Sequence, residues 1–193
     1  MFSKEYWKSS ADKLKSVRYL ALIAAFTAMK CIVSGIYIPV GENLRIGISF
    51  LFTTVEAAII GPVAAMLSGA VTDIVSFMIW PSGPFFFGYT LSSICGGLVY
   101  ALFLYRRRIT VLRLFGAKFV VNYAVNVLMG SVWSAMLYSK GYIYYAGKSL
   151  IKNTLMLPVE VILLTAVFNI LLPVLTSRKL ITAPQDKLPV KFK

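Results

Sequence analysis

The sequence contains no histidine, only two cysteines and only seven acidic residues among its 193 positions. Without histidine the chain lacks the commonest proton shuttle and the commonest transition-metal ligand, and a Ser/His/Asp catalytic set is excluded. Cys31 and Cys95 both fall inside apolar runs, as small core residues do, so we expect neither a disulfide nor a metal site. These absences argue against an enzyme.

A phosphate-binding loop is also missing. The segment GYIYYAGKS at 141–149 ends like one, but five residues separate its glycines where a P-loop has four. We therefore expect this chain to bind no ATP and to need no cofactor of its own. Any energy that it uses would come from a partner or from a gradient.

What the sequence has in excess is apolar residues in long runs. Hydrophobic residues make up 59% of the chain and charged residues 14%, against about 45–50% and about 25% in soluble domains. Runs of about 18 residues or more can cross the hydrocarbon core of a bilayer. The sequence predicts one all-α integral membrane domain over 1–193, with six transmembrane helices at about 17–37, 47–61, 62–80, 88–105, 112–138 and 150–176.

The net charge of +13 comes from basic residues that lie beside the apolar runs, which indicates membrane topology rather than a nucleic-acid partner. Fourteen basic residues flank the predicted spans on the side that holds the termini, and four lie on the other side. The positive-inside rule then places both termini in the cytoplasm. We expect a cytoplasmic N-terminal segment at 1–16 and a loose cytoplasmic tail at 177–193.

Ionisable and amide side chains inside a span are costly and are functional candidates by default. Counted from the predicted span ends, five of them fall at mid-depth or in the outer half of the membrane: Lys30, Asp73, Asn122, Asn126 and Glu160. We expect them to converge on one polar pocket that opens outward, with Glu56 converging less well. The alternative is a set of internal salt bridges, such as Lys30 with Asp73, that only hold helices together.

Two further features stand out along the chain. The outer loop WPSGPFFFGYTLS at 80–92 is rich in rings, which suit either a stacking wall for a flat ligand or an aromatic belt at the lipid interface. In the first span, small residues repeat four apart and predict a smooth face for close helix packing, either with a partner or within the protein: Ala21, Ala24, Ala25 and Ala28.

Taken together, the six spans, the Ala-x-x-x-Ala pairs, the IPVGENLRI loop and the PSGPFFFGYTLS loop resemble the S components of bacterial energy-coupling factor (ECF) vitamin transporters. The similarity covers most of 19–105 and is greatest to the folate-specific members. It implies a multi-pass protein of the bacterial cell membrane that captures folate or a reduced folate outside. It also implies docking through the Ala-rich face onto a transmembrane coupling subunit that carries two cytoplasmic ATPases.

The resemblance assigns roles by chemistry. A carboxylate, Asp73 or Glu160, would accept both hydrogen bonds from the amide N–H and amino group of a pterin. The dianionic glutamate tail would need cations, with Arg45 the best candidate and Lys30 and Lys152 next. The rings would find aromatic partners on the outer side among Trp80, Phe85, Phe86, Tyr89 and Trp133.

Three other functions remain open from the sequence. The same fold could carry another vitamin, such as riboflavin or thiamin. A secondary transporter could move protons through Asp73 and Glu160. A membrane assembly protein would bind no small ligand at all.

Overall fold

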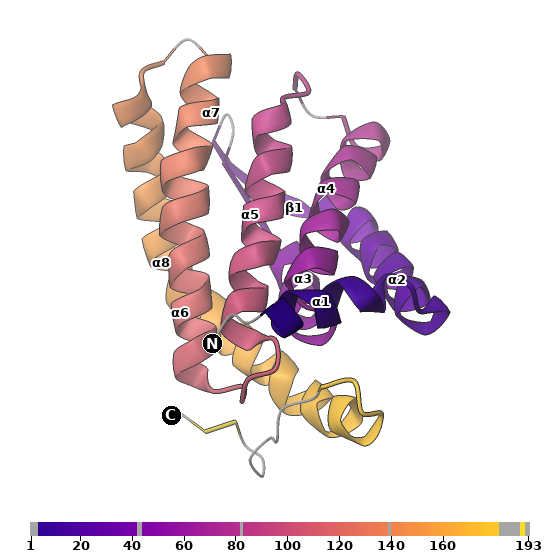
Figure 1. Cartoon of the computed structure of the whole chain (residues 1–193). Helices are drawn as coiled ribbons and strands as arrows, with labels where there is room; N and C mark the ends of the chain where they lie inside the picture. Colours follow the sequence, from indigo (N-terminus) through magenta and orange to yellow (C-terminus); the bar gives the residue numbers. More distant parts are fainter. Residues whose placement is uncertain (1–3, 42–43, 82, 139, 182–189, 192–193) are drawn as a thin grey trace.

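The computed structural model describes residues 4–41, 44–81, 83–138, 140–181 and 190–191. Figure 1 shows an upright bundle of helices with both ends of the chain at its lower end. Within the described residues, five helices are long and apolar enough to cross a membrane. They are α2 (Val17–Ser34), α4 (Pro62–Ile79), α5 (Phe87–Leu104), the continuous rod of α6 (Val111–Val120), the π-helix η1 (Val121–Met129) and α7 (Gly130–Leu137), and α8 (Tyr142–Ser177).

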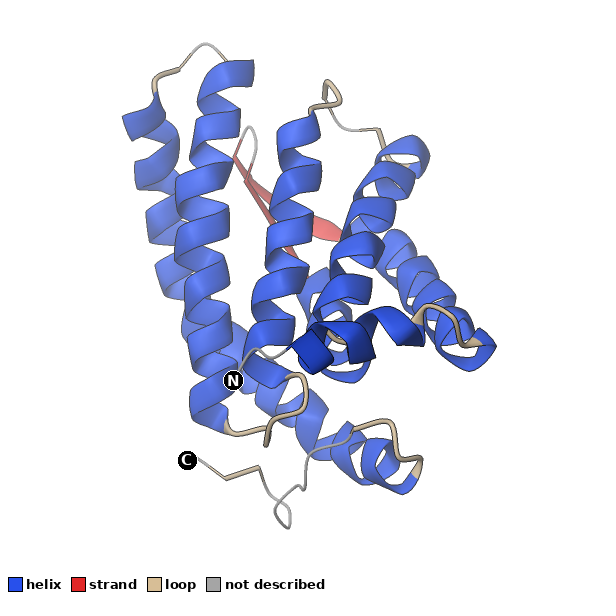
Figure 2. Cartoon of the chain, in the orientation of Figure 1, coloured by secondary structure: helices blue, strands red, loops and turns tan. Residues whose placement is uncertain are grey.

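The structure differs from the prediction between the first and third spans. A two-stranded antiparallel hairpin follows α2, with β1 (Tyr37–Gly41) paired to β2 (Leu44–Gly47), so the chain is not purely α (Figure 2). The helix after it, α3 (Ser49–Ile60), has 12 residues. At about 1.5 Å per residue it is shorter than the hydrocarbon core of about 30 Å. It therefore lies in the bundle as a short apolar helix, not as one of the five long ones.

Helices α4 and α5 pack with their backbones in close contact. A Cβ added at Gly69 would lie 2.7 Å from the carbonyl oxygen of Ser93, and one at Gly97 would lie 2.7 Å from that of Ala65. Small residues allow this approach inside a membrane, where van der Waals contact rather than water exclusion holds helices together. The contact fixes the face of α4 that carries Asp73 against the face of α5 that carries Thr90.

A short helix, α1 (Lys4–Lys13), lies across the lower end of the bundle (Figure 1). The Ser10 hydroxyl donates to the carbonyl of Ile60 at the end of α3 and accepts from the backbone N–H of Val63 at the start of α4. Gly61 joins the two helices at φ 86°, and a Cβ there would lie 2.8 Å from the Ser10 oxygen. Ser10 therefore closes a turn that only glycine fits.

Lys13, at the end of α1, donates a hydrogen bond to the carbonyl of Ile59. Its ammonium also lies over the ring of Tyr105, 4.5 Å from the centroid. Burial, and to a smaller extent the nearby charge of Arg106, lower the pKa of Lys13 to about 8. Within the predicted N-terminal segment, α1 is thus part of the fold, tied to α3 and to the end of α5.

We expect Ser10→Ala to reduce the stability of the protein by about 1–2 kcal/mol, because the start of α4 loses its capping oxygen. Thermal unfolding of the purified protein in detergent measures the effect. Ser177→Ala is the matched control, since that exposed hydroxyl bonds only to Val174 within its own helix. Equal unfolding temperatures for the two variants would contradict a capping role for Ser10.

The described end of the tail is also attached to the bundle. The backbone N–H of Val190 donates to the side-chain oxygen of Asn169 at 2.7 Å, and the carbonyl of Lys191 accepts from the backbone N–H of Val111 at 3.0 Å. The expected loose tail is therefore held, at 190–191, between α8 and the start of α6.

Candidate functional site

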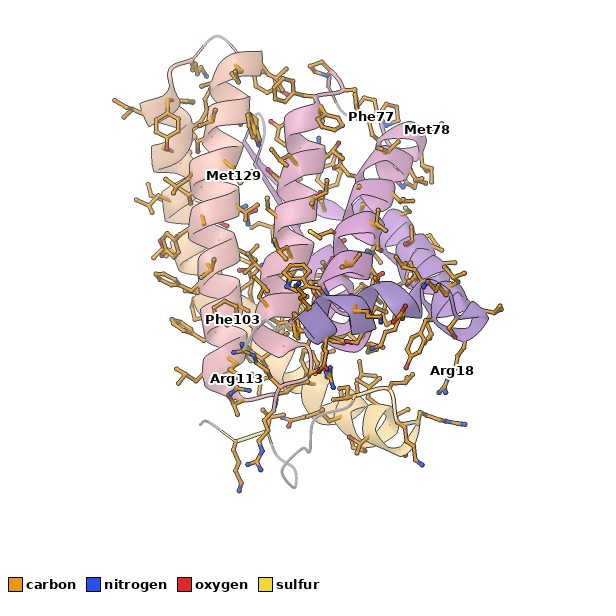
Figure 3. All side chains as sticks on the ribbon, in the orientation of Figure 1. Arg18, Phe77, Met78, Phe103, Arg113 and Met129 are labelled. Atoms are coloured by element: carbon orange, nitrogen blue, oxygen red, sulfur yellow. The ribbon has the colours of Figure 1, made fainter. Side chains whose placement is uncertain are left out.

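A cavity of about 440 Å³ opens between α4, α5, η1, α7 and α8, toward the end of the bundle opposite the termini. Ligand pockets usually have volumes of about 300–1,000 Å³. Figure 3 places Phe77, which lines the cavity, at that upper end, and Arg18 and Arg113 at the lower end. The lining includes eight of the twelve side chains predicted for the site: Arg45, Asp73, Trp80, Phe85, Phe86, Tyr89, Asn126 and Lys152.

Asp73 supplies the carboxylate of this cavity. It is half-buried on α4 and accepts hydrogen bonds from the hydroxyls of Thr90, at 2.7 Å, and Ser93, at 3.4 Å. Among the described residues the ion pairs join Lys15 to Asp12, Lys30 to Glu56 and Lys118 to Glu160, so Asp73 has no cationic partner there. A carboxylate held only by hydroxyls keeps acceptor capacity for a ligand.

Hydroxyl groups cover much of the remaining wall. Three of them, on Ser76, Ser131 and Tyr145, are buried and have no hydrogen-bond partner among the described residues. Buried polar groups normally have partners, and an unpaired hydroxyl costs free energy. The cavity is therefore prepared for a ligand that offers several polar atoms.

The aromatic residues of the loop after α4 are built into the cavity wall. The Phe86 ring packs against Trp133 at 5.7 Å between centroids and against Tyr89 at 6.2 Å. Trp133 itself lies behind the lining and donates to the hydroxyl of Ser92, at 2.9 Å. Trp80 is half-exposed at the rim, where its indole N–H donates to the carbonyl of Cys31 at the end of α2.

Lys30 lies outside the cavity. It is 2% exposed, and its ammonium contacts the carboxylate of Glu56 at 2.5 Å and the hydroxyl of Ser68 at 2.8 Å. Lys30 does form an internal salt bridge, as the alternative prediction had it, but its partner is Glu56 rather than Asp73. The pair ties α2, α3 and α4 together, and the structure does not bring Lys30 to the predicted pocket.

Glu160 and Asn122 belong to a second polar cluster. Glu160 accepts from Lys118 at 3.1 Å and from the amide of Asn122 at 2.8 Å. With Lys118 it lines a smaller cavity of about 220 Å³, whose lining shares Arg45, Asn126 and Lys152 with the first. The two cavities therefore adjoin, and the fully buried Asn122 supports the second from behind.

The π-helix η1 carries both predicted asparagines. Its amide groups form a ladder in which Asn126 donates to Asn122 at 3.3 Å and to Asn153 of α8 at 3.4 Å. Single π turns inside α-helices often mark functional sites. In this protein, η1 lies where the spanning segment α6–η1–α7 contacts the polar face of α8.

Sequence reasoning missed several of these side chains. Ser149 and Asn153 are fully buried one turn apart on α8, and their spacing was a usable signal. Lys118 falls inside the predicted span at 112–138, but no role was predicted for it. Thr90 and Ser93 gave no signal, because a lone hydroxyl residue is common in transmembrane helices.

Comparison with known proteins identifies the family to which the chain belongs. The model of the family described as ECF transporter, substrate-specific component, matches residues 18–184, which is most of the chain. The chain belongs to this family. It is thus an S component, a membrane-embedded transport protein rather than an enzyme, and its apolar helices are membrane helices.

Two relatives of this S component are named as folate transporters. The folate transporter FolT of Clostridium novyi (strain NT) is 31% identical over 121 residues, which cover 63% of this chain and 70% of the relative. FolT of Leuconostoc mesenteroides subsp. mesenteroides is 26% identical over 151 residues, covering 75% and 80%. A crystal structure of FolT bound with folic acid matches at a TM-score of 0.73 and 22% identity, over 90% of this chain and 100% of that one, which shows a shared fold.

Proposed function

We propose that this S component binds folate with high affinity at the outer face of the cell and delivers it inward when docked on a coupling subunit with two ATPases. The observation that carries the proposal is the cavity, which combines the carboxylate of Asp73, an aromatic wall and two cations, Arg45 and Lys152. Among the described residues, Asp73 has no ion-pair partner. Folate presents the complementary set: a pterin with adjacent N–H donors, two flat rings and an acidic tail. The folate names of the relatives support the same ligand.

Between the two candidate carboxylates, the contacts favour Asp73 as the group that reads the pterin. Glu160 already accepts from Lys118 and Asn122, whereas the described partners of Asp73 are two hydroxyls. Asp73 also lines the cavity together with the ring-bearing residues Phe85, Phe86 and Tyr89. A pterin can therefore stack on this wall while its amide edge meets the carboxylate.

The proposed orientation has the cavity outside and both termini in the cytoplasm. Basic residues support it, because Arg18 and Arg113 lie at the same end of the bundle as the termini (Figure 3). Cytoplasmic loops carry an excess of Lys and Arg. The proposed topology counts α3 as a short sixth segment beside the five helices that are long enough to span the membrane.

The proposed docking face is the alanine face of α2. Ala21, Ala24, Ala25 and Ala28 are all exposed. Only 11% of the residues in α2 are buried, the smallest share among the five spanning helices. A smooth, unoccupied face of small residues suits close packing against another membrane helix.

Transport of radiolabelled folate by cells tests the proposal. We expect uptake only when the chain is expressed with a coupling subunit and ATPases, and competition by unlabelled folate but not by riboflavin or thiamin. Uptake by the chain alone that collapses with the proton gradient would contradict it and favour a secondary transporter.

For the ligand contact of Arg45, we expect Arg45→Ala to weaken folate binding by about 1.5–3 kcal/mol, the usual effect of losing a hydrogen bond to a charged group. The Arg45 guanidinium lies over the ring of Tyr37, 4.5 Å from its centroid, so it is held toward the cavity by the hairpin. Calorimetric titration measures the change. Unchanged affinity would remove Arg45 from the site.

A further inference from the structure

The buried ion pair between Lys30 and Glu56 takes no part in the proposed folate site. Its two side chains are 2% and 1% exposed, and the ammonium lies 2.5 Å from the carboxylate. Neither side chain lines either of the two cavities. Because charged groups are costly to bury in a membrane protein and are functional candidates by default, the pair needs a role of its own.

The hydroxyl of Ser68, on α4, completes this pair. It donates to the other carboxylate oxygen of Glu56 at 2.6 Å and accepts from Lys30 at 2.8 Å. The hydroxyl of Thr27, on α2, lies 3.1 Å from the same oxygen. A hydroxyl has one donor and two acceptor positions, so these three contacts use the full capacity of Ser68. The cluster is therefore closed, and it joins α2, α3 and α4 to one another rather than holding a ligand.

The pair attaches α2 by the side opposite to its alanine face. An α-helix turns by about 100° per residue, which places Lys30 about 120–180° around the axis from each of the four alanines. The burial agrees, because Lys30 is buried while the alanines are exposed. Thr27 precedes Lys30 by about one turn and lies on the same inner side. The orientation of the alanine face is thus linked to the position of Lys30.

Apolar packing alone does not fix the rotation of α2 about its axis. The buried side chains of α2 are Lys30 and Cys31. Lipid tails are as apolar as leucine, so an apolar side chain loses little when it turns from the bundle toward lipid. A lysine that leaves its carboxylate for lipid is strongly penalised. The ion pair therefore favours one rotation of α2 over the others.

We propose that the Lys30–Glu56 pair, completed by Ser68, sets the rotation of α2 and thereby presents the alanine face outward to the coupling subunit. This inference rests on the proposed docking function of that face. Lys30 and Glu56 are positioning residues, since they lie away from both cavities and from the alanine face. Buried polar groups set the register of other helical assemblies in the same way, at a cost in stability.

Removing both charges at once tests the proposal. We expect Lys30→Met with Glu56→Leu to keep folate binding within about 3-fold of the unaltered protein, because distant sites act independently. The unfolding temperature should not fall, since apolar residues of similar volume often replace a buried ion pair without loss of stability. Co-purification with the coupling subunit and folate uptake by cells should each fall by about 10-fold or more, because one rotation is no longer favoured.

The reciprocal exchange, Lys30→Glu with Glu56→Lys, restores an ion pair between the same two helices. We expect it to restore co-purification and uptake. The matched control is Asp12→Leu with Lys15→Met, which removes an ion pair of 3.1 Å whose side chains are exposed. It should change neither folate binding nor uptake.

Normal co-purification and uptake in the charge-free variant would overturn the proposal. A loss of folate binding that parallels the loss of uptake would do the same, because the pair would then support the fold as a whole. If that variant does not fold, Lys30→Met with Glu56→Gln removes the charges and keeps an acceptor for Ser68, and failure of both to fold would assign the pair to stability instead. Absence of co-purification with the unaltered protein would overturn the proposed docking itself.

Discussion

Replacing Ala25 with tryptophan is expected to abolish folate uptake while leaving folate binding to the purified protein unchanged. Ala25 is exposed on the alanine face of α2, away from the cavity linings. An indole there would hold a partner helix several ångströms from the position that small residues allow. Uptake by cells that express all subunits should fall to background.

The matched control is Ala166→Trp, which adds the same side chain at an exposed position of α8. We expect it to preserve uptake. Normal uptake by the Ala25→Trp protein, or equal loss in both variants, would show that this face of α2 is not the docking surface.

Asp73→Asn is expected to weaken folate binding by about 100-fold or more. The amide offers one acceptor where the carboxylate offers two, and a hydrogen bond to a charged group contributes about 1.5–3 kcal/mol. Two such bonds to the pterin would be lost or reversed. Titration with folate measures the effect. Pteroate, which has the same pterin and aminobenzoate but no glutamate, should lose affinity by the same factor.

Glu160→Gln separates the two candidate carboxylates. We expect a smaller loss than for Asp73→Asn, because Glu160 is already paired with Lys118 and Asn122. A large loss confined to Glu160→Gln would reassign pterin recognition to the second cavity.

Hydropathy was enough to place the long helices. Whether an apolar run can cross the hydrocarbon core depends on the length and composition of that run alone. The prediction for the third span, 62–80, agrees with α4 (Pro62–Ile79), and that for the fourth, 88–105, agrees with α5 (Phe87–Leu104). Ser10 was not predicted as a cap, because a polar N-terminal segment shows no apolar period. The β1–β2 hairpin was also not predicted, because two short strands between apolar helices give no signal in hydropathy.

Depth along a span was a weaker guide than length. The depths counted from the sequence placed Lys30 and Glu56 at different levels of the membrane, yet their side chains form an ion pair at 2.5 Å. Depth counted from the ends of a run holds only if the helix crosses the membrane, and α3 is too short to cross. Depth also says nothing about which side of a helix a residue faces, so it could not show that Lys118 rather than Lys30 reaches the cavities.

Identification of the molecule bound in the larger cavity is the most direct test of folate binding. The protein would be purified in detergent without added vitamin, denatured, and its small molecules identified by mass spectrometry. We expect folate or a reduced folate at about one copy per chain, with much less recovered from the Asp73→Asn variant. Recovery of riboflavin or thiamin, or of no vitamin from a protein that also fails to bind added folate, would contradict it.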